Sequence, residues 1–231
     1  MNVLIVAAHP DDEVLGCGGT MARLAAEGHH VSVAILGEGA TSRGLESDVA
    51  QEAKAKLAAQ AAQAAEILGV CPPSMHELPD NRFDSLDLLD VVKIVEELVD
   101  THRPELIFTH HPGDLNIDHQ ITHRAVVTAA RPLESCSVRR ILAFEIPSST
   151  EWASPMLSAS FVPTTMMDIA GYLETKLLAL QQYSGELGSD THPRSLKHVS
   201  ELAGVRGRAA GFSAAESFAT VWERIFKGQT L

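Results

Sequence analysis

Short apolar runs alternate with longer segments of helical periodicity through most of the chain. The runs predict strands at 3–8, 30–36, 75–78, 105–109 and 140–146. The segments between them predict helices at 14–27, 46–68, 86–102 and 117–130, and Gly28 and Gly69 stand where two of these helices should end. Strands that alternate with helices are typical of an α/β fold of the Rossmann-like, doubly wound kind, with a mainly parallel sheet and helices on both faces.

The alternation weakens after about residue 147. Residues 148–163 contain Trp152, two prolines and several serines, which predicts a long loop, and helices are expected at 168–183 and 195–210. This tail is too short and too apolar for a second domain. We therefore expect a single domain over 1–231, with a core at about 1–147 and a C-terminal lid or edge elaboration at about 148–231.

Composition narrows the range of partners. The net charge of −12 disfavours the backbone of a nucleic acid and an anionic membrane surface. No signal-peptide pattern precedes the first predicted strand, and no apolar run is long enough to span a bilayer. Three cysteines at unrelated spacings fit neither a disulfide framework nor a CxxC zinc site. We expect a cytoplasmic protein with a small-molecule substrate, and a homo-oligomer remains open.

An acidic turn follows the first predicted strand. It reads His-Pro-Asp-Asp-Glu at positions 9–13 and places one imidazole and several carboxylates where the strand ends. The carboxyl ends of parallel strands are where ligands bind in open α/β sheets. Ionisable groups packed this closely favour a positive charge between them, and a divalent metal is the simplest candidate. Glu13 is interpreted as a first-turn acid that favours the start of the helix.

A second polar cluster follows the fourth predicted strand and ends in Asp118 and His119. His9, Asp12 and one histidine of this cluster would give three protein ligands, which is the arrangement of a catalytic zinc site with an open position. Asp11 is then the spare carboxylate that could take a proton from water. His119 and His123 are four residues apart on a predicted helix, a spacing that also fits two zinc ligands.

These two clusters resemble the motifs of the PIG-L/LmbE family of metal-dependent N-deacetylases. The stretches AHPDDE, DLNIDH, FEIPSSTEW, HPRS and AAESF are similar to one bacterial branch of that family. The resemblance implies that His9, Asp12 and His119 bind the metal and that Asp11 is the general base. It also implies a zinc-dependent hydrolase, with another divalent metal such as Fe²⁺ possible, that removes an N-acetyl group from an amino sugar or glycoconjugate.

The chain departs from the family pattern at Asn116. Many members carry a histidine there, three residues before the third ligand, which is thought to stabilise the oxyanion or protonate the leaving amine. An amide can donate a hydrogen bond to an oxyanion but cannot deliver a proton. Either Asp11, once protonated, also acts as the acid, or another histidine does. His110, His111 and His192 are the candidates.

Further residues are candidates for substrate contact or for structural support. Arg43 stands in the loop after the second strand and could clamp a hydroxyl or phosphate of the substrate. Asp114 could contact substrate or hold its loop, and His192 and Arg194 could form a pocket wall. Several other residues have two interpretations each. His123 could be a ligand or a structural residue, and Asp118 could orient a site group or cap the helix. Trp152 could stack on a sugar or anchor its loop, and Gly16, Gly18 and Gly19 could form a nucleotide loop or, as the missing G-x-G-x-x-G spacing favours, allow close helix packing.

Two other function classes stay open. Two histidines and one aspartate also form the ligand set of non-haem iron oxygenases. That chemistry usually needs an open face free of acids, whereas Asp11 adjoins this site. The chain could instead be a non-catalytic ligand-binding module, which the intact ligand set disfavours and Asn116 favours. Acetate release from N-acetylated sugars, with and without a chelator, separates the three classes.

Overall fold

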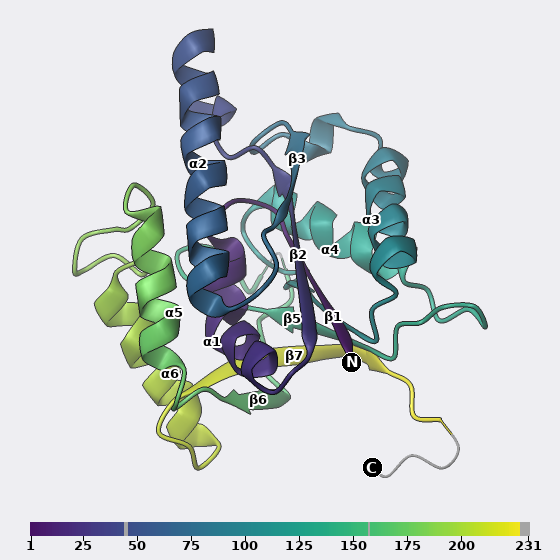
Figure 1. Cartoon of the computed structure of the whole chain (residues 1–231), viewed down its shortest axis with the longest axis vertical. Coiled ribbons are helices and arrows are strands. Elements are labelled where there is room, and N and C mark those ends of the chain that lie inside the picture. Colours follow the sequence, from purple (N-terminus) through teal and green to yellow (C-terminus); the bar gives the residue numbers. More distant parts are fainter. Residues whose placement is uncertain (44–45, 157, 227–231) are drawn as a thin grey trace.

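Seven strands form one twisted sheet with helices on both faces (Figure 1). The computed structural model describes residues 1–43, 46–156 and 158–226. The strands are β1 Asn2–Ala7, β2 His30–Gly37, β3 Ser74–Leu78, β4 Leu106–His110, β5 Arg140–Phe144, β6 Thr165–Asp168 and β7 Ala215–Glu223. The helices are α1 Asp12–Ala26, α2 Ser47–Leu68, α3 Leu88–His102, α4 Ile117–Ala129, α5 Leu173–Leu180 and α6 Leu196–Ala209, with 3-10 turns at Thr41–Arg43, Phe83–Ser85 and Gln181–Tyr183.

The strand order is β3-β2-β1-β4-β5-β7-β6. The first five strands are parallel, while β7 runs antiparallel to both β5 and β6. The chain winds outward from β1 in one direction and from β4 in the other, so the strand order reverses between these neighbours. In such sheets ligands bind at the carboxyl ends of the strands beside that point. The predicted doubly wound α/β class is confirmed.

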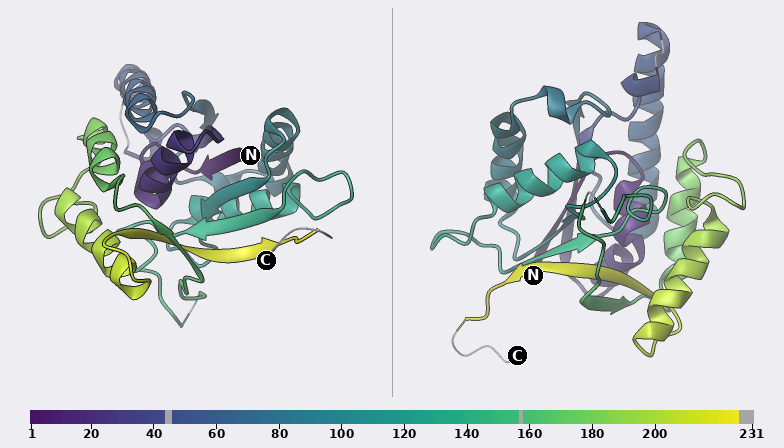
Figure 2. Two further views of the ribbon diagram at one scale, coloured as in Figure 1. Left: turned by 60° about the horizontal axis from the view of Figure 1, so that its bottom comes forward. Right: turned by 180° about the vertical axis from the view of Figure 1, so that it is seen from behind.

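Side-chain alternation along the strands builds two apolar layers, one on each face of the sheet. In β1, Val3, Ile5 and Ala7 belong to the cluster that packs against α1, α2 and α5. Leu4 and Val6 belong to the cluster that packs against α3 and α4. Figure 2 shows these helices in separate layers on either side of the strands. Strands buried on both faces explain the continuous apolar runs of the sequence.

The C-terminal part contributes two strands that the sequence analysis missed. The helix expected at 168–183 begins at Leu173, because β6 occupies Thr165–Asp168 and pairs with β7. The segment β6 is short and half-buried, so it carries no clear alternation of apolar and polar positions. Of the two forms expected for the C-terminal part, a lid or an addition to the sheet edge, the structure shows that this part extends the sheet at its edge. Among the described residues, no helix is long and apolar enough to cross a bilayer.

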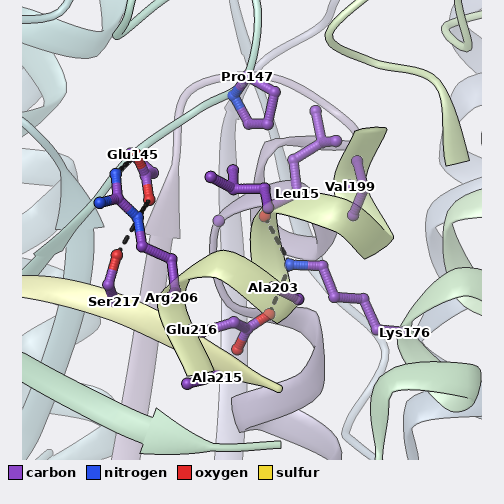
Figure 3. Close-up of a pocket in the computed structure, with 12 residues that line it drawn as sticks. Leu15, Glu145, Pro147, Lys176, Val199, Ala203, Arg206, Ala215, Glu216 and Ser217 are labelled. Carbon is purple, nitrogen blue, oxygen red and sulfur yellow. Dashed lines mark hydrogen bonds and ion pairs between the residues drawn. The ribbon is translucent and has the colours of Figure 1, made fainter. Parts of the chain in front are cut away.

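Helix α1 is interrupted at Cys17, whose φ of −149° and ψ of 24° are not helical. A buried ion pair bridges the interruption (Figure 3). The Lys176 ammonium donates to the Leu15 carbonyl at 2.8 Å and to Glu216 Oε1 at 2.6 Å. The Glu216 carboxylate in turn accepts the backbone N–H of Thr20 at 2.7 Å. This pair replaces helical hydrogen bonds lost at the interruption, which is how a buried charge pair is satisfied.

The glycines of α1 serve helix packing. A Cβ at Gly16 would lie 2.5 Å from the ring of Phe144, and one at Gly19 would lie 2.8 Å from Ile169. The absence of these side chains lets α1 approach the sheet and the C-terminal part closely. The preferred reading of the glycines, close packing rather than a nucleotide loop, is thus supported at Gly16 and Gly19.

Candidate metal and catalytic site

The turn between β1 and α1 is held by its own carboxylates. The backbone N–H of His9 donates to Asp12 Oδ2 at 2.9 Å, and the backbone N–H of Asp11 donates to Glu13 Oε2 at 3.1 Å. Asp11 adopts a left-handed conformation with a φ of 104°, which is uncommon for a residue with a side chain. The turn therefore has one defined shape, and it directs the side chains of residues 9, 11 and 12 to the carboxyl edge of the sheet.

The loop after β4 brings the second half of the site to the same edge. Asn116 caps α4, because its Oδ1 accepts the backbone N–H of Asp118 at 2.8 Å. The first turn of α4 then carries Asp118 and His119, both fully buried, beside the carboxyl end of β1. The pairing of β1 with β4 explains why motifs more than one hundred residues apart meet here.

His9, Asp12 and His119 converge on one point. His9 Nδ1 and His119 Nε2 each lie 3.2 Å from the same oxygen, Asp12 Oδ2. The three ligand atoms all lie within 4.8 Å of one another. Two ligands bound about 2.0–2.1 Å from a tetrahedral zinc ion are about 3.3 Å apart. Asp12 Oδ1 and His119 Nε2 are buried and make no aligned hydrogen bond in the described structure. The residues therefore fit a divalent metal.

The other nitrogen of each histidine faces a carboxylate. His9 Nε2 lies 2.9 Å from Asp118 Oδ2, and His119 Nδ1 lies 3.0 Å from Asp114 Oδ1. Carboxylates in this position orient metal-binding imidazoles and raise their basicity. His9, Asp80 and Asp118 form a second possible ligand group, but it uses the outer nitrogen of His9. We therefore read this second group as support for the first.

The adjacent carboxylates Asp11 and Asp12 differ in their electrostatic surroundings. Burial raises the pKa of Asp11 well above its usual range, and the Arg194 guanidinium opposes that shift. Burial also disfavours charge on Asp12, but His119 and His110 outweigh it and hold the pKa of Asp12 well below its usual range. Neighbouring residues of the same type thus differ in how readily they take up a proton: Asp11 does so more readily than a free aspartate, and Asp12 less readily.

The histidines are strongly stabilised in their charged forms without a metal. Burial lowers the pKa of His9, but Asp118 and Asp12 outweigh burial and raise it to about 10. The pKa of His119 is raised to about 9, because Asp12 and Asp114 likewise outweigh burial. The site therefore favours positive charge between its carboxylates, which protons or a metal ion can supply.

Asp11 has one held oxygen and one free oxygen. Its Oδ2 accepts from Arg194 Nη1 at 2.9 Å, and Arg194 Nε donates to Ser148 Oγ at 2.9 Å. Its Oδ1 is buried and has no hydrogen-bond partner within the described residues. An unpartnered buried carboxylate oxygen is costly, and next to the candidate ligands it is available to a bound molecule.

A polar cavity opens onto this group of residues. It is lined by His9, Pro10, Asp11, Gly39, Ser42, Leu57, Asp80, Asn81, Asn116, Glu186 and Arg194. Asn116 Nδ2 donates to Asn81 Oδ1 at 2.9 Å, which leaves the second amide hydrogen of Asn116 for a ligand. Asp80 and Asn81 were not singled out from the sequence. Their signal was their place directly after the short third strand, at the same edge of the sheet.

The four predicted substrate contacts differ in their surroundings, and Asp114 is the most enclosed of the described side chains among them. Asp114 is buried, and its oxygens contact His119, the backbone N–H of Asn116 and the hydroxyls of Ser149 and Thr150. These contacts favour the alternative reading of Asp114, in which it holds its loop, and they also place it behind His119.

The other three predicted contacts are His192, Arg194 and Arg43. His192 lies outside the cavity lining, where its Nδ1 accepts the backbone N–H of Arg194 and its ring packs edge-on against Trp152. Arg194 does line the cavity. Arg43 ends the turn Thr41–Arg43 near the same edge, and its side chain lies outside the described part of the structure.

The remaining histidines have structural partners. His110 Nε2 accepts the backbone N–H of Ala8 at 2.8 Å, and burial lowers the pKa of His110 well below its usual range. His111 contacts the carbonyl of Ala159 at 2.9 Å, and His123 contacts the carbonyl of His110 at 2.8 Å. These contacts disfavour His110, His111 and His192 as the acid and support the structural reading of His123. Asp118 is the orienting group for His9, since Asn116 is the helix cap.

Glu13 is more than the start of a helix. It is buried, and its Oε1 accepts the hydroxyl of Tyr183 at 2.5 Å while its Oε2 accepts the backbone N–H of Asp11. The sequence analysis assigned Glu13 only to the first turn of α1 and did not single out Tyr183. No local pattern in the sequence links residues 170 positions apart.

Comparison with known proteins decides the family. Residues 4–130, more than half of the chain, match the family described as "PIG-L: GlcNAc-PI de-N-acetylase". The chain belongs to the PIG-L family. The matched region contains both halves of the site and ends before the C-terminal part that completes the sheet.

Two relatives cover most of the chain. "Uncharacterized deacetylase YaiS" of Escherichia coli K12 is 28% identical over 189 residues, which cover 79% of this PIG-L chain and 90% of that relative. The "1D-myo-inositol 2-acetamido-2-deoxy-alpha-D-glucopyranoside deacetylase" of Mycobacteroides abscessus is also 28% identical, over 228 residues that cover 80% of this chain and 81% of the relative.

Solved structures share the whole fold. GalB, the 4-carboxy-2-hydroxymuconate hydratase of Pseudomonas putida KT2440, superposes with a TM-score of 0.76 at 22% identity, with full coverage of both chains. The N,N'-diacetylchitobiose deacetylase of Pyrococcus horikoshii gives a TM-score of 0.75 at 21% identity and covers 95% of this chain and 83% of its own. Because a hydratase and a deacetylase share it, the fold of this PIG-L member does not decide its reaction.

Proposed function

We propose that this PIG-L member is a divalent-metal-dependent hydrolase that removes an N-acetyl group from an amino sugar or glycoconjugate. The observation that carries the proposal is the convergence of His9 Nδ1, Asp12 Oδ2 and His119 Nε2 beside the unpartnered oxygen of Asp11. The two matched relatives described above are named as deacetylases, which supports the same reaction class.

His9, Asp12 and His119 would hold the metal, and three protein ligands are typical of a catalytic site that keeps one coordination position open. A divalent metal held there, with zinc as the preferred candidate, supplies Lewis acidity that lowers the pKa of a bound water to about 7 and polarises an amide carbonyl. His9 and His119 would bind the metal as imidazoles oriented by the carboxylates behind them, and the metal would replace the protons that these carboxylates otherwise favour. Asp12 would contribute a negative charge.

Asp11 is proposed as the general base. Its free Oδ1 is the proton acceptor, while Arg194 holds Oδ2 and so fixes the plane of the carboxylate. Burial raises the pKa of Asp11, which makes it a better base than an exposed aspartate and lets it retain the proton it takes. The same proton can then be delivered to the leaving amine, since none of the other histidines we considered is positioned as the acid.

Asn116 is proposed to stabilise the oxyanion. Its side chain lines the cavity, and its orientation is fixed by bonds to Asp118 and Asn81. A donor fixed in this way gains strength in a site that excludes water. The polar lining of the cavity, which includes Ser42, Asp80 and Asn81, suits the hydroxyl groups of a sugar.

The test is acetate release from a panel of N-acetylated sugars and sugar conjugates, with and without a chelator. We expect turnover that a chelator abolishes and that added Zn²⁺ restores. The Asp11→Asn variant should keep its metal but lose about 100- to 10,000-fold in kcat, the usual contribution of a general base.

Three outcomes would contradict this proposal. Metal-dependent oxygen uptake without acetate release would favour an iron oxygenase. Binding of the sugars without release of acetate by the metal-loaded protein would favour a binding module. Full activity of Asp11→Asn would show that Asp11 is not the base.

A further inference from the structure

We propose that Glu13 and Tyr183 are positioning residues that hold the backbone of Asp11 in its working conformation. Tyr183 lies outside the region matched to the family, in the turn that follows α5. The inference deepens the proposed function and rests on the role of Asp11 as the base. It assigns a catalytic consequence to a contact between the first turn of α1 and the C-terminal part of the chain.

The backbone of Asp11 needs external support. Its φ of 104° lies in the left-handed region, where a side chain costs energy, and such conformations persist when surrounding contacts fix them. Its carbonyl accepts the backbone N–H groups of Val14 and Leu15 at 3.1 and 2.9 Å. Its own N–H donates to Glu13 Oε2 at 3.1 Å. The carboxylate of Glu13 therefore fixes the N–H side of the Asp11 backbone.

Glu13 is itself held by one tyrosine. Both residues are buried, with exposed fractions of 2% for Glu13 and 0% for Tyr183. The phenol donates to Glu13 Oε1 at 2.5 Å, which leaves Oε2 for the N–H of Asp11. A buried carboxylate without this donor would lose half of its hydrogen bonds and turn toward another partner. The hydroxyl of Tyr183 thus fixes Glu13, and Glu13 fixes Asp11.

A purely structural role would make a different prediction. If Tyr183 only fills the core, the loss of its hydroxyl should lower stability without a selective effect on turnover. If it positions Asp11, the loss should reduce kcat, since catalytic geometry is sensitive to small displacements. The metal ligands His9 and Asp12 are not bonded to Glu13, so metal binding should not change in either case.

The experiment compares Tyr183→Phe with Tyr172→Phe, which makes the same chemical change at a half-buried position nearby. With the sugar from the panel that gives the fastest acetate release, Tyr183→Phe should lose about 10- to 100-fold in kcat with little change in KM. Tyr172→Phe should retain the kcat of the parent. Both proteins should bind a full complement of metal, and their Co²⁺ absorption spectra should match that of the parent.

A double-variant cycle connects the effect to Asp11. In the Asp11→Asn background, Tyr183→Phe should cause no further loss of kcat, because the group it positions is already disabled. Glu13→Gln should be milder than Glu13→Ala, since an amide can accept from the Asp11 N–H and still donate to Tyr183. Equal losses of kcat in the parent and Asp11→Asn backgrounds would overturn the inference.

A readout that does not depend on turnover separates this inference from the proposed function. Amide hydrogen exchange at Asp11, measured by NMR on the metal-loaded protein, should be faster in Tyr183→Phe than in Tyr172→Phe. If no sugar is deacetylated but exchange at Asp11 responds in this way, the proposed reaction fails and the contact is confirmed. Unchanged exchange at Asp11 in Tyr183→Phe would overturn the inference whatever the reaction is.

Discussion

The two parts of the chain on either side of the end of β5 contribute differently to the site. The part up to Phe144 carries the candidate ligands and the candidate base. The described part beyond it carries residues that hold them: Arg194 bonds Asp11, Tyr183 bonds Glu13, and Ser149 and Thr150 bond Asp114. In this fold, the ends of the parallel strands carry the candidate chemical groups, and loops and turns of the part after β5 contact and hold them.

This difference follows from topology. Ligands at the ends of neighbouring parallel strands are brought together by the sheet itself, whatever follows in the chain. Their exact orientation requires further contacts, because a strand end or a helix start leaves side-chain rotamers free. The C-terminal part returns across the sheet edge and supplies those contacts. We therefore expect substitutions of the candidate ligands and base in the first part to abolish metal binding or turnover. Substitutions of the supporting residues in the second part should reduce metal affinity or kcat only partially.

The largest effect is expected at His119. The His119→Ala variant should lose stoichiometric metal, since it removes one of three ligands. Loss of a residue that only orients a ligand costs about 10- to 100-fold in metal affinity, so loss of the ligand itself should cost on the order of 1000-fold or more. Metal content after dialysis and competition with a chromophoric chelator measure this directly.

His123→Ala is the matched control, four residues further along the same helix. His123 is also buried, but its Nδ1 contacts the carbonyl of His110 instead of the ligand group. We expect this variant to be less stable, by about 1–3 kcal/mol for the buried group left unpaired, and to retain its metal. Loss of metal from His123→Ala with retention in His119→Ala would reverse the assignment of the third ligand.

The sequence alone was enough to predict those parts of the molecule whose positions follow from the local residue pattern and from the order of the strands. Apolar runs that end at polar clusters predicted the five parallel strands and the edge at which the site lies. His9, Asp12 and His119 are adjacent in space because the strands that precede them are adjacent, and the motif resemblance selected His119 from several histidines. Their convergence in the structure supports that selection.

The supporting residues could not be predicted in the same way. Glu13 looks like an ordinary first-turn acid, and its partner lies 170 residues away in a turn without a motif. The sequence left two readings of Asp114, a substrate contact or a residue that holds its loop, and only the fold shows Ser149 and Thr150 placed against it. Such contacts depend on how the C-terminal part crosses the sheet edge, and the short half-buried strand β6 gives little periodic signal of that path.

An intermediate effect is expected at Arg194, through which the second part contacts Asp11, the proposed base. Arg194→Met preserves most of the side-chain bulk but removes the donor to Asp11 Oδ2. The carboxylate then loses a fixed orientation, and kcat should fall by about 10- to 100-fold while metal content stays complete. Arg208→Met, on the exposed face of α6, is the control and should behave like the parent. A loss of metal from Arg194→Met would show that the second part is needed to build the ligand group, and would break the comparison.

The smallest effect is expected at Ser149, which is two contacts away from the metal position. Its hydroxyl bonds Asp114, and Asp114 Oδ1 lies 3.0 Å from His119 Nδ1. Ser149→Ala removes that bond while the hydroxyl of Thr150 and the backbone N–H of Asn116 continue to hold Asp114. Because two supports remain, metal affinity should fall by less than the about 10-fold lower bound for an orienting residue, and stability should fall by about 1–3 kcal/mol.

Ser160→Ala, in the same segment but exposed, is its control and should leave metal affinity and stability unchanged. Metal competition and thermal unfolding of the two variants measure both quantities. Suppose that Ser149→Ala lost as much metal affinity as His119→Ala. The loop after β5 would then determine the geometry of the ligands by itself. The division between a part that supplies the groups and a part that refines their positions would then no longer hold.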